Sequence, residues 1–298
     1  MKPDTLRNLL QKNKNLIVPG IYDALSARLA EDAGFNAVFM TGYGVSASLL
    51  GKPDIGLLTS VEMARTIAYI TNAIDIPVIA DADTGYGSPL NVSRTVQLYE
   101  DAGASAIQIE DQQWPKRCGH MEGKQVIPMD EMVAKILSAV EARKKNETII
   151  IARTDAIAVE GFNQAIKRSQ AYIEAGADML FLEGPENLDQ LAAIPSLLPI
   201  PHIINLAETG KGLQLITDDV WKMGYKLALF PITGLLVATN AMKKAYLTLK
   251  TNHGSRYLEH EMISYREFNS FIGMEEGVVI DERLLDDARD LIIRQRKD

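Results

Sequence analysis

A helix end, a glycine and an apolar run follow one another at four places in this chain of 298 residues. The four copies begin at Asp32, Asp101, Glu174 and Lys222. Glycine closes a helix readily because it adopts the left-handed backbone conformation without a steric cost. Each copy therefore predicts a helix that ends at a glycine and a strand that follows within a few residues.

Four further apolar runs bring the number of predicted strands to about eight, and a helical pattern separates each run from the next. The runs are continuous rather than alternating, which is typical of parallel strands buried on both faces. They are residues 16–19, 37–41, 77–81, 106–110, 148–153, 179–183, 202–205 and 226–231. We therefore expect an α/β protein, a (β/α)8 TIM-type barrel made of four βαβ units. A doubly wound open sheet is disfavoured, since no glycine-rich fingerprint follows the first strand.

The pattern changes after Lys250, where the chain becomes charged and amphipathic. Apolar residues at helical spacing predict a long stripe with no barrel strand left to cover. They are Leu258, Met262, Tyr265, Phe268 and Phe271. We predict a catalytic barrel over residues 1–250 and a helical oligomerisation extension over 251–298. The stripe would pack on a partner subunit or, alternatively, on the chain's own barrel.

Charge and cysteine content exclude several classes of function. The formal net charge of −8 provides no positive field for nucleic acid or anionic lipid. The uncharged stretch from Leu227 to Met242 is interrupted by Pro231 and Gly234 and is too short to span a bilayer. The single cysteine and the absence of a signal-peptide pattern predict a cytoplasmic protein. A small molecule or a metal ion is the expected partner.

Barrel enzymes carry their chemistry at the carboxyl ends of the strands, so polar residues there are candidate site residues. They are Thr41, Gly42, Tyr43, Asp81, Asp83, Glu110, Arg153, Glu183 and Asn205, with Asp54 after the second strand. Buried carboxylates this close together need a compensating cation. Because every candidate ligand is an oxygen, Mg²⁺ is favoured over zinc, with Mn²⁺ as an alternative. Helix caps or strand-end ion pairs are the other reading of these acids.

Within this acidic set, Asp81 and Asp83 are expected to point to the same side of one strand, with Glu110 at the end of the next. Arg153 could bind a substrate carboxylate through two N–H groups. Its alternative is a structural ion pair with Asp155 or Glu183.

The one cysteine, Cys118, lies in a loop with cationic neighbours shortly after Glu110-Asp111. Such neighbours make apolar burial unfavourable and favour the thiolate. A general acid, however, must hold its proton until it acts. A carbanion formed beside the thiol would take that proton within the closed site. We expect Cys118 to be a general acid.

Four motifs together resemble the isocitrate lyase and phosphoenolpyruvate mutase superfamily, from about Val18 to about Ala245. They are Asp81-Ala-Asp-Thr-Gly-Tyr-Gly87, Ile109-Glu-Asp-Gln112, Lys116-Arg-Cys-Gly-His120 and Ala152-Arg-Thr-Asp155. The cysteine loop is similar to that of the carbon–carbon lyases, namely 2-methylisocitrate lyase, 2,3-dimethylmalate lyase and the petal death proteins.

The resemblance implies roles for the matching positions. It implies Mg²⁺ held through Asp81, Asp83 and Glu110 with Asp54 close by. Cys118 would be the general acid on a mobile loop, with Gly119 and His120 beside it. The substrate site would be lined by Arg153, Glu183, Asn205 and the turn of Thr41, Gly42 and Tyr43. It also implies a homo-oligomer, in which dimers that exchange a C-terminal helix pair into tetramers.

The resemblance further implies a Mg²⁺-dependent lyase that cleaves a 2-hydroxy di- or tricarboxylate to pyruvate and a second carboxylate. Ala207 stands two residues after Asn205, where many methylisocitrate lyases have a threonine for the third carboxylate. We therefore favour a 2-alkyl- or 2,3-dialkylmalate, with methylisocitrate close behind. The alternatives are an oxaloacetate hydrolase, a phosphoenolpyruvate or carboxyphosphonoenolpyruvate mutase, and a silent dicarboxylate-binding barrel.

Overall fold

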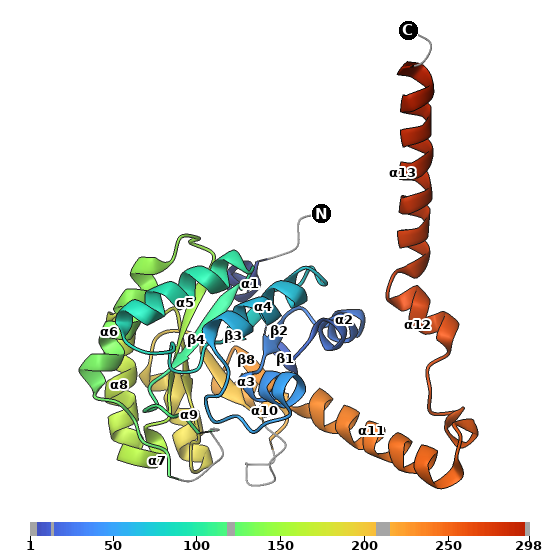
Figure 1. Cartoon of the computed structure of the whole chain (residues 1–298). Helices are drawn as coiled ribbons and strands as arrows, with labels where there is room; N and C mark the ends of the chain where they lie inside the picture. The colour runs from blue at the N-terminus through green and yellow to red at the C-terminus, as the bar shows by residue number, and fades with distance from the viewer. Residues whose placement is uncertain (1–4, 13–14, 118–122, 207–214, 296–298) are drawn as a thin grey trace. The chain divides into compact units, whose positions relative to one another are not determined.

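Eight parallel strands form a closed barrel in sequence order in the computed structural model (Figure 1), which describes residues 5–12, 15–117, 123–206 and 215–295. Strand β1 pairs with both β2 and β8, which closes the sheet. The strands are β1 (Leu16–Ile21), β2 (Val38–Met40), β3 (Val78–Asp81), β4 (Ala106–Glu110), β5 (Ile149–Thr154), β6 (Met179–Leu182), β7 (His202–Asn205) and β8 (Leu227–Phe230). The predicted barrel is confirmed, and every predicted strand is found within two residues of its expected bounds.

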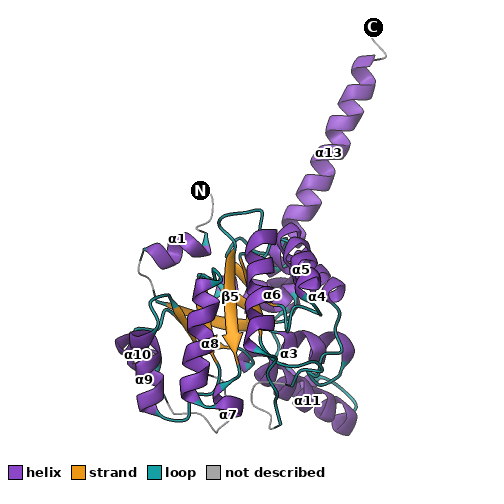
Figure 2. Cartoon of the chain, turned by 90° about the vertical axis from the view of Figure 1, so that its left-hand side faces the viewer, coloured by secondary structure: helices purple, strands orange, loops and turns teal. Residues whose placement is uncertain are grey.

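Helices surround the barrel, as Figure 2 shows for α6 and α8 beside β5. They are α1 (Leu6–Gln11), α2 (Ala24–Asp32), α3 (Gly42–Val45), α4 (Ser60–Thr71), α5 (Pro89–Asp101), α6 (Met129–Ala142), α7 (Ile157–Glu160), α8 (Phe162–Glu174), α9 (Leu188–Leu197) and α10 (Thr217–Met223). Helix α3 runs directly into a π-helical turn, Ser46–Leu50. No helix among the described residues is long and apolar enough to cross a membrane.

The four glycine joints take the conformation that the sequence predicts. Gly34, Gly103, Gly176 and Gly224 have φ angles of 87°, 96°, 96° and 101°. They follow α2, α5, α8 and α10, and each precedes an even-numbered strand. The left-handed residue ends each helix and directs the chain into the next strand.

Apolar side chains fill the interior of the barrel and leave its carboxyl rim to polar groups. Phe39, Ile79, Ile151 and Phe181 belong to one buried cluster inside the strands. Leu6 on α1 belongs to the same cluster, so this helix closes the amino-terminal end of the barrel. The polar candidates at the other end therefore stand on a rigid, packed base.

The chain divides into two compact units, residues 1–238 and 239–298. Helix α11 (Thr233–Asn252) crosses this boundary, and the second unit continues through a 3-10 turn (Arg256–Leu258), α12 (Tyr265–Phe271) and α13 (Met274–Gln295). The predicted division at residue 250 stays a prediction.

The single helical stripe expected from Leu258 to Phe271 is wrong. Leu258 lies in the 3-10 turn, whereas Tyr265 and Phe271 lie on α12. Ser264 separates them, since its hydroxyl accepts a hydrogen bond from the Glu267 amide (3.1 Å) and starts a new helix. Tyr265 is 81% exposed while Leu258 is buried, so these residues do not form one face.

Candidate functional site

Three acids meet where β3 and β4 end. Asp81 is the last residue of β3 and Glu110 is the last residue of β4, and both are buried. Asp83 is also buried, but it lies after the strand with a φ of 48°, so the expectation that Asp81 and Asp83 share one strand is wrong. The reason is a turn in which the Asp83 amide donates to Asp81 Oδ1 (3.2 Å) and the Asp83 carbonyl accepts from the Glu110 amide (2.8 Å).

The turn after β2 packs directly against this acidic cluster. The Gly42 amide donates to Asp81 Oδ2 at 3.2 Å. A Cβ atom at position 42 would lie 2.9 Å from the same oxygen, so a side chain there would displace the Asp81 carboxylate. Thr41 is the buried N-cap of α3, and Tyr43 is about one-third exposed. The predicted turn therefore lies at the site, with its Gly42 amide used to hold Asp81.

A lysine that the sequence did not single out completes the cluster. The Lys116 ammonium lies 2.6 Å from Asp54 Oδ1 and 2.5 Å from Asp83 Oδ1, and the lysine side chain is only 3% exposed. This ion pair brings Asp54 into contact with the acid site, as predicted for a nearby acid. For Lys116, the available signals in the sequence were its cationic charge and its position two residues before Cys118, but neither predicts burial.

Burial and neighbouring charges oppose each other at these groups. Burial raises the pKa of Asp83 to about 6, even though the Lys116 ammonium lowers it. Burial also raises the pKa of Glu110 well above its ordinary value, against the effect of Arg153. For Lys116 burial disfavours the charged form, but Asp83, Asp54 and Asp81 raise its pKa well above the usual value. The ammonium is therefore firmly charged inside the cluster.

Arg153 joins the acid cluster to the rims of β6 and β7. Its Nε lies 3.0 Å from Asp155 Oδ2 and 3.4 Å from Glu110 Oε2, and its Nη2 lies 3.4 Å from Glu183 Oε2. The Asn205 amide is 3.4 Å from that Glu183 oxygen. The guanidinium carbon lies 5.0 Å from the centre of the Phe181 ring, so the side chain reaches over the barrel interior. The structure thus brings Arg153, Glu183 and Asn205 together.

Asp155 occupies one edge of the Arg153 guanidinium. Its two oxygens accept hydrogen bonds from Arg153 Nε (3.0 Å) and Nη2 (3.2 Å). Burial alone would raise the pKa of Asp155, but Arg153 and Lys124 hold it at about 2. The structural partner considered for Arg153 is therefore present. A substrate carboxylate would have to use the rest of the guanidinium.

Both flanks of the cysteine loop are attached to the site. Gln112 and Val126 form an antiparallel bridge at the base of the loop. Beyond Lys116 on the first flank, Lys124 on the second flank lies 2.7 Å from Asp155 Oδ1. The predicted site residues Cys118, Gly119 and His120 lie outside the described residues.

The donor set fits a hard divalent cation, because the buried carboxylates and Asn205 all offer oxygen. Glu110 Oε1 and Asn205 Oδ1 are buried without a hydrogen-bond partner in the described structure. As the side chains stand, however, no three acidic, histidine or cysteine groups among the described residues are gathered closely enough to hold a metal ion. The ammonium of Lys116 already bridges Asp54 and Asp83.

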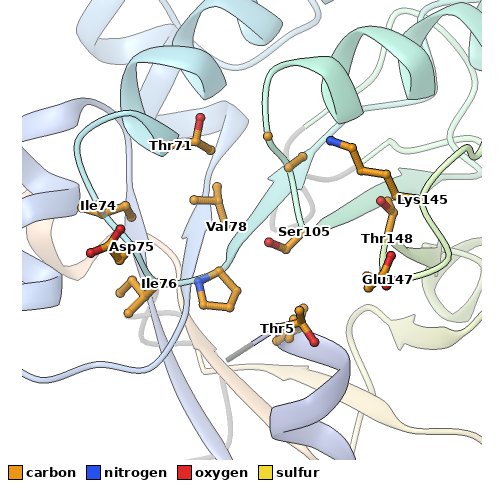
Figure 3. A pocket seen from close by; sticks show the side chains of 14 residues that line it. Thr5, Thr71, Ile74, Asp75, Ile76, Val78, Ser105, Lys145, Glu147 and Thr148 are labelled. Carbon is orange, nitrogen blue, oxygen red and sulfur yellow. The ribbon is translucent and has the colours of Figure 1, made fainter. Parts of the chain in front are cut away.

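A cavity of about 260 Å³ lies at the amino-terminal end of the barrel (Figure 3). Thr5, Val78, Ser105 and Thr148 line it, and these residues lie just before α1 and at the amino ends of β3, β4 and β5. It is therefore separate from the acid cluster at the carboxyl rim.

Comparisons with known proteins agree on one family. The family model described as phosphoenolpyruvate phosphomutase matches residues 6–249. The chain is 42% identical to 2,3-dimethylmalate lyase of Eubacterium barkeri, with 91% of this chain and 94% of that protein covered. It is 42% identical to carboxyvinyl-carboxyphosphonate phosphorylmutase of Arabidopsis thaliana (92% and 82% covered). It is 38% identical to 2-methylisocitrate lyase of Aeropyrum pernix (97% and 93% covered).

Solved structures give the same result. A crystal structure of 2,3-dimethylmalate lyase superposes with a TM-score of 0.87 at 36% identity, with 93% of each chain covered. Oxaloacetate acetylhydrolase in complex with 3,3-difluorooxalacetate gives 0.89 at 33% identity (95% and 97% covered). Phosphonopyruvate hydrolase in complex with oxalate and Mg²⁺ gives 0.86 at 29% identity (96% and 99% covered).

Proposed function

Because the chain belongs to the phosphoenolpyruvate phosphomutase family and is a carbon–carbon lyase of that superfamily, we propose that it cleaves a 2-alkyl- or 2,3-dialkylmalate to a 2-oxo acid and a second carboxylate. The 2-oxo acid is pyruvate when the 2-alkyl group is methyl. The observation that carries the proposal is Arg153, whose side chain is 11% exposed and lies among Glu110, Asp155 and Glu183 at the carboxyl rim. Asp155 takes one edge of the guanidinium, and the remaining N–H groups of this fixed side chain suit a substrate carboxylate. The identity to 2,3-dimethylmalate lyase supports the dicarboxylate.

Side chains of the rim provide the binding and orientation. Arg153 would bind a substrate carboxylate and keep it at a fixed distance from the acid cluster. Asn205 and Glu183 are in hydrogen-bond contact with each other, and their amide and carboxylate would orient the 2-hydroxyl and its neighbouring carboxylate. The interior below is packed with apolar side chains, which limits the access of water to the broken bond.

Asp81, Asp83, Glu110 and Asp54 would hold Mg²⁺, which supplies Lewis-acid stabilisation of negative charge when it is bound. The oxygen-only donor set and the unpartnered Glu110 Oε1 support this assignment. The Mg²⁺ and oxalate in the phosphonopyruvate hydrolase structure are a precedent within the same fold.

The reaction balances with one base and one acid. A base removes the proton of the substrate 2-hydroxyl, the alkoxide becomes the ketone of pyruvate, and the adjacent carbon–carbon bond breaks. Its electron pair leaves with the second carboxylate as an enediolate. Cys118 then donates its thiol proton to that carbon. Lys116, two residues before Cys118, reaches into the acid cluster, which supports a place for the loop beside the reacting atoms.

The test is a substrate panel under one set of conditions. We expect cleavage of 2,3-dimethylmalate or 2-methylmalate to pyruvate to have a higher kcat/KM than cleavage of 2-methylisocitrate to pyruvate, of isocitrate to glyoxylate, or of oxaloacetate to oxalate. Pyruvate release should stop after chelation and return when Mg²⁺ is added. Continued release without a divalent cation would remove the metal from the mechanism.

A second variant tests the proton donor. Cys118→Ser should keep substrate binding and lower kcat by at least about 10²-fold, because serine is a much weaker acid than cysteine. Near-normal turnover of Cys118→Ser would show that the proton comes from another group.

Oxaloacetate hydrolysis is the second candidate function, because oxaloacetate acetylhydrolase has a TM-score of 0.89 with this chain. Formation of oxalate and acetate from oxaloacetate in the same panel would favour it over the alkylmalate lyase.

The C-terminal unit supports a homo-oligomer in which α12 and α13 pack on a second copy of the chain. Val278, Leu285 and Ile292 are spaced seven residues apart on α13 and are more than half exposed. A homotetramer in the cytoplasm is the state that we propose.

A further inference from the structure

We propose that Lys116 is an internal counter-ion of the acid cluster, which a divalent cation displaces when it binds. The inference rests on the proposed metal site and extends it: the chain's own ammonium group competes with the metal for Asp54 and Asp83. Lys116 is therefore a positioning residue that controls the affinity for the metal.

The contacts of Lys116 carry the first step. Its ammonium is within 2.6 Å of one oxygen of Asp54 and within 2.5 Å of one oxygen of Asp83. The lysine side chain is 3% exposed, and the two carboxylates are 10% and 4% exposed. Water therefore does little to screen the attraction between Lys116 and the two carboxylates.

The charges of the neighbouring groups carry the second step. Lys116 is attracted by Asp81 and Glu110 as well as by its two direct partners. Without an ammonium, four buried or nearly buried carboxylates would repel one another. A bound divalent cation would supply that compensation by itself. An ammonium and a divalent cation in the same cluster would repel each other strongly, so one should weaken the binding of the other.

The arrangement of the acids carries the third step. No three acidic side chains of the described segments are gathered closely enough to form a finished metal site, although they meet at the same rim. One oxygen of Asp83 forms an ion pair with Lys116. Glu110 has one buried oxygen without a hydrogen-bond partner. The acids therefore hold an ammonium at present, and release of Lys116 would free Asp54 and Asp83 to turn toward a metal.

Lys124 provides a matched control within the same loop. It is also a buried lysine, with a side chain 5% exposed, and its ammonium is 2.7 Å from Asp155. Its ion partner Asp155 lies directly after β5 and is not one of the two acids that hold Lys116. Its removal changes the charge of the protein by the same amount, but it should disturb the acid cluster far less.

The first experiment measures Mn²⁺ binding to the full-length protein without substrate, by calorimetry and by the electron paramagnetic resonance signal of free Mn²⁺. Lys116→Met should bind Mn²⁺ at least about tenfold more tightly than the unaltered protein, because a close positive charge has been removed. Lys124→Met should differ from the unaltered protein by less than about threefold. Equal or weaker binding by Lys116→Met would overturn the inference. Absence of Mn²⁺ binding in all three proteins would overturn the metal assignment and the inference with it.

The second experiment needs no variant and therefore does not depend on the folding of Lys116→Met. Brief acetylation of the unaltered protein, followed by mass spectrometry, reports the access of water to each amine. Saturating Mg²⁺ should raise the labelling of Lys116 several-fold and leave Lys124 unchanged. Lys116 that stays protected while Mg²⁺ is bound would show that both cations share the site, which would overturn displacement but keep the proposed metal.

Discussion

Asp111 is a buried carboxylate that connects β5 and α8 through hydrogen bonds. Asp111 follows β4 and accepts hydrogen bonds from the Thr154 hydroxyl (2.6 Å), the Tyr172 hydroxyl (2.8 Å) and the Asp155 amide (3.0 Å). The last of these hydrogen bonds holds Asp155, which is the ion partner of Arg153. Burial raises the pKa of Asp111, although its hydrogen bonds partly oppose this. A structural acid thus directly follows the functional Glu110 in the chain.

Asp111→Asn should lower the free energy of unfolding by about 2–4 kcal/mol, because the amide NH2 replaces one of the two acceptor oxygens and faces the donors bound there. Urea denaturation measures the loss. Tyr172→Phe removes only one of the three bonds and should cost about 1 kcal/mol. Equal losses for the two variants would mean that Asp111 does not act as a shared acceptor.

His202, at the start of β7, predicts the pH dependence of stability. Burial lowers its pKa below the ordinary 6.5, while its Nε2 contacts the Leu198 carbonyl at 3.0 Å. The unfolded chain takes up a proton near pH 6.5, but the folded chain does so only at lower pH. Stability should therefore fall as pH drops below 6.5, by up to about 1.4 kcal/mol per pH unit for this group.

Thermal or urea unfolding between pH 7.5 and 5 measures this slope. His202→Gln replaces the imidazole with an amide that can donate to the Leu198 carbonyl but cannot titrate, so its slope should be shallower than that of the unaltered protein. His253→Asn, at an exposed site with a φ of 52°, is the control and should leave the slope unchanged. An unchanged slope in His202→Gln would assign the pH dependence to other groups.

At the scale of elements, closure of the barrel depends on the contact between β1 and the end of β8. A Cβ atom at Gly20 would lie only 1.9 Å from the carbonyl oxygen of Pro231, which is backbone and cannot turn away. The residue before it, Pro19, pairs with Phe230. A side chain at position 20 would therefore push the first and last strands apart.

Gly20→Ala should cost at least about 3 kcal/mol of folding free energy, because the clash is with the backbone. Gly277→Ala is the comparison, since nothing lies within 4 Å of the added methyl group on α13. It should leave stability unchanged or raise it by up to about 1 kcal/mol through helix propensity. Circular dichroism melts of both variants measure the difference, and a mild effect of Gly20→Ala would show that β1 can move.

At the scale of the whole molecule, the apolar residues of α13 lack a core within the described part of the second unit. Leu284, Leu285, Leu291 and Ile292 are all more than half exposed. They fall on one side of the helix, and an exposed apolar stripe of this length is typical of an interface. A second copy of the chain is the occupant that we propose.

The double variant Leu284→Glu and Leu291→Glu should dissociate the oligomer, because charges would be buried without partners at the interface. Light scattering after size-exclusion chromatography measures the mass. Arg283→Glu, on the charged side of α13 where Arg283 pairs with Asp287, should keep the oligomer intact. A double variant with unchanged mass would place the interface elsewhere.

The amino-acid sequence by itself determined the barrel, its strands and the acids at the carboxyl rim. Continuous apolar runs and helix-ending glycines span only a few residues. The local backbone preference of those residues is therefore enough to predict the strands and the helix ends. Gly224, for example, takes the left-handed conformation because α10 ends there. The long stripe near Leu258 failed because spacing alone does not reveal that Ser264 starts a new helix.

Only the tertiary structure decided how the charges pair. Lys116 and Lys124 become buried because the described flanks of the cysteine loop, joined by the bridge between Gln112 and Val126, lie against acids of distant segments. Asp155, rather than a ligand, takes one edge of Arg153 in the described structure. Such pairings depend on distances between segments far apart in sequence and on how much water burial removes. Neither quantity exists before the barrel closes, so no local pattern could have revealed them.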